Sequence, residues 1–413
     1  MLTLIEALNF RCLNYVRQPL GSFHVLVGPN ASGKTTFLDV VALLGELVSE
    51  GLTEAIEGRT HNFHDLVWRR SGDSFELAIE ARIPDDRRRS LSETTFDRVR
   101  YEVKLGLETE SGEISILSEK ALLKAAPVDK ARQIDLFPAP PQVPETIQAA
   151  SKGAKIVVNK VRDGNDNFYD ETGGKWNPAF KLGPRRSALA NLPEDESKFP
   201  VCTWLKGFLV TGVQRFVLNS LLLRKASPPG QMRGFKSDGS NLPWVAADLQ
   251  RRAPERFADW VAHLGTALPD LESIRIVERE DDKHRYLVLG YRGGLEVPSW
   301  MASDGTLRLL ALTLPAYLNG LEGIYLIEEP ENGIHPRAVE TMFQSLSSVY
   351  GSQVLLATHS PVILSVADPK DVLCFAKSPE GATDIVTGEN HPALRAWHGE
   401  TNLGVLFASG VLG

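Results

Sequence analysis

Cysteine is scarce in this chain, which excludes a small fold held together by disulfide bonds. Only three cysteines, Cys12, Cys202 and Cys374, occur among 413 residues. They lie far apart in the sequence, and their spacing matches no common metal-binding pattern. Such a scattered set is typical of proteins kept in a reducing compartment, so we expect a cytoplasmic location.

Long apolar runs and an excess of positive charge are also missing. Apolar stretches such as Leu309 to Leu318 are shorter than the roughly 20 residues that a membrane helix requires. Glu6 stands early, and no basic segment leads into an apolar one, so we expect neither a secretory signal nor membrane association. The net charge of −7 gives no general basic field for nucleic acid, although local DNA contact stays open at Arg87–Arg89 and Arg185–Arg186.

A glycine-rich segment from Gly28 to Thr35 is the most informative feature that is present. Its sequence, Gly-Pro-Asn-Ala-Ser-Gly-Lys-Thr, fits the phosphate-binding P-loop pattern. The apolar run His24–Val27 predicts a short buried strand before it, and Thr36–Leu44 predicts a helix after it. Backbone N–H groups at such a helix start form a concave site for anions. Lys34 adds a charge that can reach phosphates, and the Thr35 hydroxyl can join a Mg²⁺ shell.

Two carboxylates follow an apolar strand in the last third of the chain. Gly323–Ile327 predicts a strand buried on both faces, and Glu328, Glu329 and Pro330 come directly after it. In P-loop proteins an acid at this position supports the Mg²⁺. Neighbouring strand residues point to opposite faces, so Glu328 can face the metal while Glu329 faces the attacking water.

Two further segments carry hydrogen-bond donors that could bind a phosphate. His359 follows a predicted strand, Gln353–Ala357, and could donate a hydrogen bond to a phosphate or to water; the alternative is a structural histidine. Ser303-Asp304-Gly305-Thr306 opens a predicted helix, Leu307–Leu318, whose first N–H groups can receive an anion. An ordinary helix cap is the alternative interpretation there.

The remaining pattern predicts an α/β fold with a large insertion. Strands with alternating polarity predict an antiparallel meander; they are Phe75–Glu80, Val99–Leu105, Ile114–Ile116 and Lys155–Val158. Helical segments are expected at Thr203–Leu223 and Leu242–Leu264, and a strand pair at Ile274–Val277 and Tyr286–Tyr291. The last third alternates helix and strand, which favours a mostly parallel sheet shared with the P-loop strand. We expect a discontinuous core, 1–72 and 266–413, and an inserted antiparallel β and helical region, 73–265.

The order of these motifs resembles an ABC-type ATPase head. Ser303–Leu310, Ile327–Pro336, Ala7–Arg11 and Gly28–Thr36 are similar to the stand-alone AAA-family ATPases of the overcoming-lysogenization-defect and SMC-like group. The resemblance covers the first forty residues and roughly Ser299 to Pro361, and the middle of the chain matches only in outline.

That resemblance implies a head-to-tail homodimer, or a higher oligomer, that holds ATP and Mg²⁺ between its copies. Glu329 would be the catalytic base and His359 the γ-phosphate sensor, while Thr35 and Glu328 would hold the metal. Ser303, Asp304 and Gly305 would act on the partner's nucleotide, with Asn332-Gly333 at the dimer seam. The ATP-binding residues would be Asn30, Ala31, Ser32, Gly33, Lys34, Thr35 and Thr36.

Two departures from the family pattern stand out. Glu328 occupies a position where transporter-type heads usually carry Asp. No glutamine occurs between Thr36 and Ala131, so the usual glutamine linking Mg²⁺ to the inserted lobe has no obvious candidate. The transporter signature Leu-Ser-Gly-Gly-Gln is also missing, which argues against a transporter head.

The resemblance further implies an ATP-hydrolysing switch in bacterial anti-phage defence. The residues after His359 are too few for a metal-dependent nuclease domain, so we expect a separate effector protein of nuclease type. Two alternatives stay open: a DNA repair or maintenance ATPase that senses DNA directly, and a nucleotide-dependent scaffold with negligible turnover. The apolar tail, Leu403 to Gly413, is expected either to pack on its own domain or to dock a partner.

Overall fold

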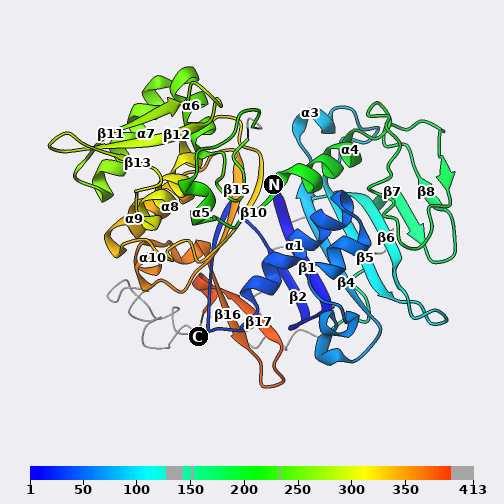
Figure 1. Ribbon diagram of the computed structural model, residues 1–413. Coiled ribbons are helices and arrows are strands. Elements are labelled where there is room, and N and C mark those ends of the chain that lie inside the picture. Colours follow the sequence, from blue (N-terminus) through cyan, green and yellow to red (C-terminus); the bar gives the residue numbers. More distant parts are fainter. Residues whose placement is uncertain (127–142, 150–152, 232–233, 392–413) are drawn as a thin grey trace. The chain divides into compact units, whose positions relative to one another are not determined.

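The structure is a computed structural model that describes residues 1–126, 143–149, 153–231 and 234–391 (Figure 1). Contacts between residues divide the chain into two compact units. Unit 1 holds residues 1–21, 30–213 and 375–385; unit 2 holds residues 22–29, 214–374 and, among the described residues, 386–391. The domain boundaries expected near residues 72 and 265 remain a prediction. The tail from Leu403 to Gly413 lies outside the described residues.

Unit 1 is built on an eight-stranded antiparallel sheet with the order β2-β1-β4-β5-β6-β7-β8-β9. The predicted meander is therefore confirmed, and the two N-terminal strands join the same sheet. The strands are β1 (Leu2–Phe10), β2 (Leu13–Pro19), β4 (Ser74–Arg82), β5 (Phe96–Leu107), β6 (Ile114–Ala125), β7 (Ala154–Val161), β8 (Asp166–Phe168) and β9 (Ala179–Phe180). The α-helices are α1 (Lys34–Ser49), α2 (Leu52–Glu57), α3 (Asp85–Arg88) and α4 (Pro200–Gly207).

Helix α1 lies against this sheet and contacts β1 and β4 (Figure 1). Its side chains are buried almost all round, from Phe37 to Val48, as expected for a helix enclosed in a core. Phe37 meets Phe375 edge to face, with ring centroids 5.6 Å apart. The helix that follows the glycine-rich loop is thus held firmly by packing.

The remaining elements include the parallel strands that the sequence predicts. The strands are β3 (Phe23–Val27), β10 (Val213–Phe216), β11 (Leu271–Glu278), β12 (Arg285–Tyr291), β13 (Leu295–Pro298), β14 (Gly323–Glu328), β15 (Ser352–Ala357), β16 (Val372–Lys377) and β17 (Thr383–Thr387). The α-helices are α5 (Ser220–Arg224), α6 (Leu242–Arg252), α7 (Pro254–Ala267), α8 (Asp304–Thr313), α9 (Pro336–Ser347) and α10 (Pro361–Val366).

A parallel sheet with the order β14-β15-β3-β16 forms the centre of unit 2, and β10 lies beside β14. In register, Leu326 pairs with Leu355 and Leu355 with His24. Parallel strands end at the same edge of a sheet, so the segments after β3, β14 and β15 share one edge. Strands β11, β12 and β13 form a separate antiparallel sheet.

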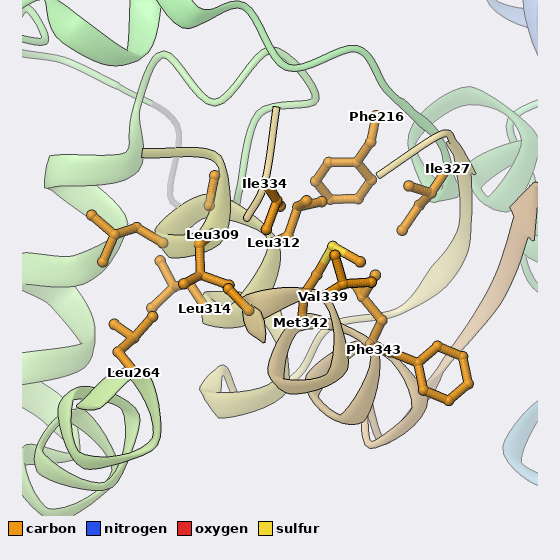
Figure 2. Close-up of a cluster of buried hydrophobic side chains, with 14 of the residues drawn as sticks. Phe216, Leu264, Leu309, Leu312, Leu314, Ile327, Ile334, Val339, Met342 and Phe343 are labelled. Atoms are coloured by element: carbon orange, nitrogen blue, oxygen red, sulfur yellow. The ribbon is translucent and has the colours of Figure 1, made fainter. Parts of the chain in front are cut away.

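Helices α8 and α9 pack together and supply much of the apolar core of unit 2 (Figure 2). On α9, Val339, Met342 and Phe343 are buried at helical spacing. Leu309 and Leu312 of α8 belong to the same cluster. Burial of one such side chain contributes about 1.5–3 kcal/mol, so this core fixes the two helices against the sheet.

Two helix predictions are corrected by the structure. The helical prediction for Thr203–Leu223 is wrong over 213–216, where the chain forms β10 next to β14. Its apolar residues fit a short strand as well as a helix, and pairing with a neighbouring strand decides between them. Leu242–Leu264 forms two helices, because Pro254 cannot continue the first and begins the second.

Within the described residues, no helix combines the length and the apolar character that crossing a bilayer requires. In the same part of the chain, no group of three or more His, Cys, Asp and Glu side chains is placed to hold a metal ion.

Candidate functional site

The glycine-rich loop has the backbone conformation that an anion site requires. Strand β3 ends at Val27, and helix α1 begins at Lys34, as predicted. Gly33, with φ 106°, precedes the helix and gives it no side-chain cap, while Ala31 is also left-handed, with φ 62°. The first turn of α1 carries no acidic residue. An uncapped helix start without nearby acid favours a negatively charged ligand.

Unit 1 supports this loop from the side with a threonine of β17. The Thr383 hydroxyl donates to the Ser32 carbonyl oxygen over 2.9 Å, and the Thr383 N–H donates to the Cys12 carbonyl over 2.9 Å. A Cβ atom on Gly33 would lie 2.2 Å from the Thr383 hydroxyl oxygen. Only glycine therefore fits at position 33.

The side chains of the loop differ in exposure. Lys34 and Ser32 are buried, Asn30, Ala31 and Thr35 are exposed, and Thr36 is half-buried and hydrogen-bonded to Cys12. The Ser32 Oγ atom is buried and has no hydrogen-bond partner among the described residues. An orphaned hydroxyl in a loop of left-handed residues fits a phosphate oxygen.

Glu328 and Glu329, at the end of β14, have different partners, while the expectation that one faces the metal and the other the attacking water stays a prediction. Glu328, the last residue of the strand, forms an ion pair with Arg215 of β10 over 2.6 Å. Glu329 has left-handed backbone, with φ 47°, and its N–H donates to the Ala357 carbonyl. The Asn332 side-chain amide donates to Glu329 Oε2 over 2.5 Å. Left-handed backbone at a non-glycine residue is strained and is often found at functional sites.

The histidine segment is tied to the same turn. The Thr358 hydroxyl donates to Glu331 Oε1 over 2.6 Å, and the His359 N–H donates to the same oxygen over 3.1 Å. Ser360 begins α10 as its N-cap, with Pro361 as the first helical residue. The strand end and helix start expected around His359 are therefore confirmed.

The predicted helix start at Ser303 is also confirmed. Ser303 is the N-cap of α8, and its hydroxyl accepts a hydrogen bond from the Thr306 N–H over 3.1 Å. Asp304 would repel an anion, but the Arg224 side chain pairs with its carboxylate at 2.7 Å and 2.8 Å. This pairing leaves the positive end of the helix dipole available.

Helix α8 begins against the turn that follows Glu329. A Cβ atom on Gly305 would lie 2.3 Å from the Gly333 carbonyl oxygen, so glycine is required by close backbone approach. Arg308 lies close to the Asn332 carbonyl. A pocket of about 430 Å³ beside Glu328 and Glu329 is lined also by Arg215, Arg308, Asn332 and six neighbouring residues.

Five of the predicted site residues belong to unit 2: Ser303, Gly305, Glu328, Glu329 and His359. The loop residues Asn30 to Thr36 belong to unit 1 and follow directly on the segment 22–29 of unit 2.

Sequence reasoning missed several residues that contact the expected ones. Arg215, Arg224 and Thr383 lie far along the chain from their partners, and no spacing pattern indicates them. Glu331, inside the acidic motif, could have been singled out. Gln214 stands on β10, beyond the glutamine-free range between Thr36 and Ala131. Its Oε1 atom is buried without a hydrogen-bond partner in the described chain.

Comparison with known proteins places the chain in a family. Residues 23–365 match the family model described as "AAA domain, putative AbiEii toxin, Type IV TA system". Comparison with curated proteins found no match.

Among solved structures, an SmcHead bound to the C-winged helix domain of ScpA is 13% identical with a TM-score of 0.55, over 93% of this chain and 97% of that chain. An Smc head domain with an extended coiled coil bound to the C-terminal domain of ScpA, derived from Pyrococcus furiosus, is 13% identical with a TM-score of 0.49, over 93% and 95%. The chain thus belongs to this AAA-domain family, and its fold is that of an SMC or ABC-type P-loop ATPase head.

Proposed function

We propose that this protein hydrolyses ATP with Mg²⁺. The observation that carries the proposal is the shared edge of the parallel sheet: β14 ends in Glu328, β15 ends just before His359, and β3 leads into the glycine-rich loop. Phosphoryl transfer depends mainly on positioning and on stabilising charge, and residues of these types supply both.

Each residue has a proposed role. Backbone N–H groups from Asn30 to Thr36 and the Lys34 ammonium bind the phosphates. Thr35 and Glu328 would hold Mg²⁺, which supplies positive charge at the phosphates when bound. Glu329 accepts a proton from the attacking water, and His359 donates a hydrogen bond to the γ-phosphate. Gln214 is proposed as the glutamine that links the metal site to the rest of unit 2.

We propose that two copies pair head to tail, so that Ser303, Asp304 and Gly305 of one copy meet the nucleotide on the other. The ion pair between Arg224 and Asp304, which offsets the negative charge at the start of α8, supports this arrangement. Apolar side chains stand exposed just before it: Trp300 is 44% and Met301 71% exposed. Exposed apolar groups beside an anion-binding helix start suit an interface with a second copy.

The experiment that tests the enzyme is an ATPase assay with three proteins. Wild type should release phosphate in Mg²⁺ and not in excess chelator. Lys34→Ala should lose ATP binding, whereas Glu329→Gln should bind ATP and lose turnover by roughly 100-fold or more. Unchanged turnover in Glu329→Gln would show that Glu329 is not the base, and no turnover in wild type would favour a scaffold.

We further propose that the ATPase controls a separate effector, of nuclease type, in bacterial anti-phage defence. The family description includes the words "putative AbiEii toxin, Type IV TA system", and the similar SmcHead is bound to another protein, ScpA. Cells carrying the wild-type gene with its neighbouring genes should survive phage challenge, and cells carrying Lys34→Ala should not. Strong, salt-sensitive DNA binding by the isolated protein would instead favour the direct DNA sensor.

A further inference from the structure

Glu331 is a charged residue in the acidic turn to which the proposed reaction assigns no role. It is half-buried, and its Oε1 atom accepts from both the Thr358 hydroxyl and the His359 N–H. Hydrogen bonds to a carboxylate are shorter and stronger than those to a neutral acceptor. The side chain thus joins the turn after β14 to the segment that leaves β15.

Thr358 is held on its other sides as well. It is fully buried, and its N–H donates to the Leu26 carbonyl of β3 over 3.1 Å. Its hydroxyl oxygen accepts from the Ser360 N–H over 2.9 Å, and Ser360 caps α10. The hydroxyl proton is left for Glu331, so this hydrogen bond completes the anchoring of the segment that carries His359.

The turn is closed at its other end by Asn332. The Asn332 N–H donates to the Glu329 carbonyl over 3.1 Å, and its side-chain amide holds the Glu329 carboxylate. Within the four consecutive residues 329–332, Asn332 therefore holds the carboxylate of Glu329, and Glu331 holds the backbone of His359.

Glu331 binds these donors at a cost in stability. Its second oxygen, Oε2, is buried and has no hydrogen-bond partner among the described residues. A buried carboxylate oxygen without a partner is destabilising, and a well-packed apolar residue would avoid this. The presence of this half-satisfied acid beside Glu329 and His359 favours a role in the reaction over a role in folding.

We infer that Glu331 is a positioning residue, which holds the His359 backbone in a fixed relation to Glu329 so that both groups meet the same γ-phosphate. The inference rests on the proposed ATP hydrolysis and deepens it. Its action passes through Thr358 and His359, and Glu331 itself need not touch the nucleotide.

The test compares Glu331→Ala, Glu331→Gln and a matched control, Glu340→Ala, which removes an exposed acid on α9. Glu331→Ala should lower kcat roughly 10- to 100-fold while the Kd for ATP changes less than about threefold, since misplacement affects the reacting groups most. Glu331→Gln keeps a carbonyl acceptor and should recover most of the loss. The control should match wild type.

A double-mutant cycle identifies the route. If Glu331 acts through His359, Glu331→Ala should reduce kcat no further in a His359→Ala background. Independent, multiplicative losses would overturn the inference, as would an unchanged kcat in the single variant.

A second measurement needs no turnover. Amide hydrogen exchange over 358–360 in nucleotide-free protein should become at least about tenfold faster in Glu331→Ala and stay unchanged in Glu340→Ala. Unchanged exchange in Glu331→Ala would overturn the inference even if the proposed ATPase activity failed. If wild type showed no ATPase activity but exchange over 358–360 were faster in Glu331→Ala, only the proposed ATP hydrolysis would be rejected.

Discussion

Gly33 occupies a position that no other residue type can take without moving the loop. Its φ of 106° is left-handed, and an added methyl group would meet the Thr383 hydroxyl at 2.2 Å. We expect Gly33→Ala to weaken ATP binding by roughly tenfold or more, because both strain and overlap act on the phosphate loop. Isothermal titration with ATP measures this effect.

The control for that substitution is Gly207→Ala. Gly207 has helical backbone at the end of α4, with open space around its Cα. Alanine there should leave ATP binding unchanged and slightly stabilise the helix. Equal ATP affinity in the two variants would mean that the Gly33 conformation does not matter for binding.

Arg215 is the ion-pair partner of Glu328, a proposed ligand of the metal. Its guanidinium lies 2.6 Å from a carboxylate oxygen that is proposed to support Mg²⁺. A cation at this place competes with the metal, and both side chains are partly exposed, so the effect should be modest. We expect Arg215→Gln to lower the Mg²⁺ concentration for half-maximal ATPase activity roughly two- to fivefold.

Arg275→Gln serves as its control, because Arg275 forms an exposed ion pair with Glu296 on the antiparallel sheet β11-β12-β13. It should not alter the Mg²⁺ requirement. A weaker Mg²⁺ response in Arg215→Gln would show instead that Arg215 orients Glu328 for the metal.

Single residues of the candidate site were predictable where a local pattern exposes them. Ser303 was expected at a helix start because of the Gly and the apolar run that follow it, and it is the N-cap of α8. The partners of these residues were not predictable. Arg215 and Thr383 reach Glu328 and Ser32 only after folding, and nothing in the intervening sequence sets that distance.

At the level of elements, the first N–H groups of helix α4 in unit 1 are bound by a buried carboxyl group, that of Glu171. Glu171 accepts hydrogen bonds from the N–H groups of Val201 and Cys202 over 2.7 Å and 2.8 Å. Burial raises the pKa of Glu171 to about 7, although these two N–H groups act in the opposite direction. The folded protein thus holds this proton to higher pH than the unfolded chain does.

The sign of the pH effect follows from that difference. The contribution of Glu171 to stability is fully present below its unfolded pKa, near 4.5, and is lost as pH rises to about 7. The free energy of unfolding should therefore fall by up to about 3 kcal/mol over this range, relative to Glu171→Gln. Urea unfolding at pH 5 and pH 7.5 measures it, and parallel pH profiles would contradict it.

Elements were predictable where the sequence pattern of apolar residues is plain. The apolar runs at His24–Val27 and Gly323–Ile327 form β3 and β14, because strands of a parallel sheet are buried on both faces. Strand β10 was missed inside a predicted helix, since its four residues are too short for any period to show. Its pairing with β14 is a tertiary contact that local sequence does not encode.

At the scale of the whole molecule, the proposed head-to-tail dimer predicts complementation between two inactive variants. Lys34→Ala damages the phosphate loop. Ser303→Asp keeps a good helix cap but places negative charge where the partner's phosphates would lie. Each variant alone should be inactive, because both sites of its dimer carry one defect.

Mixing the two variants should restore about a quarter of wild-type turnover, because half of the random dimers are mixed and each has one intact site. Phosphate release after mixing at equal concentration measures this, and Lys34→Ala mixed with Glu329→Gln is the control that should stay inactive. Absence of recovery, with mixed dimers demonstrated by pull-down, would rule out sites shared between copies.

The pairing of β3 with β15 and β16 has a consequence for synthesis on the ribosome. Residues 23–27 leave the ribosome long before both of their hydrogen-bonding neighbours, 352–357 and 372–377. The nascent chain must keep an apolar strand with unpaired edges until then, a state prone to aggregation. Nascent chains stalled before position 350 should accordingly recruit chaperones that full-length protein no longer binds.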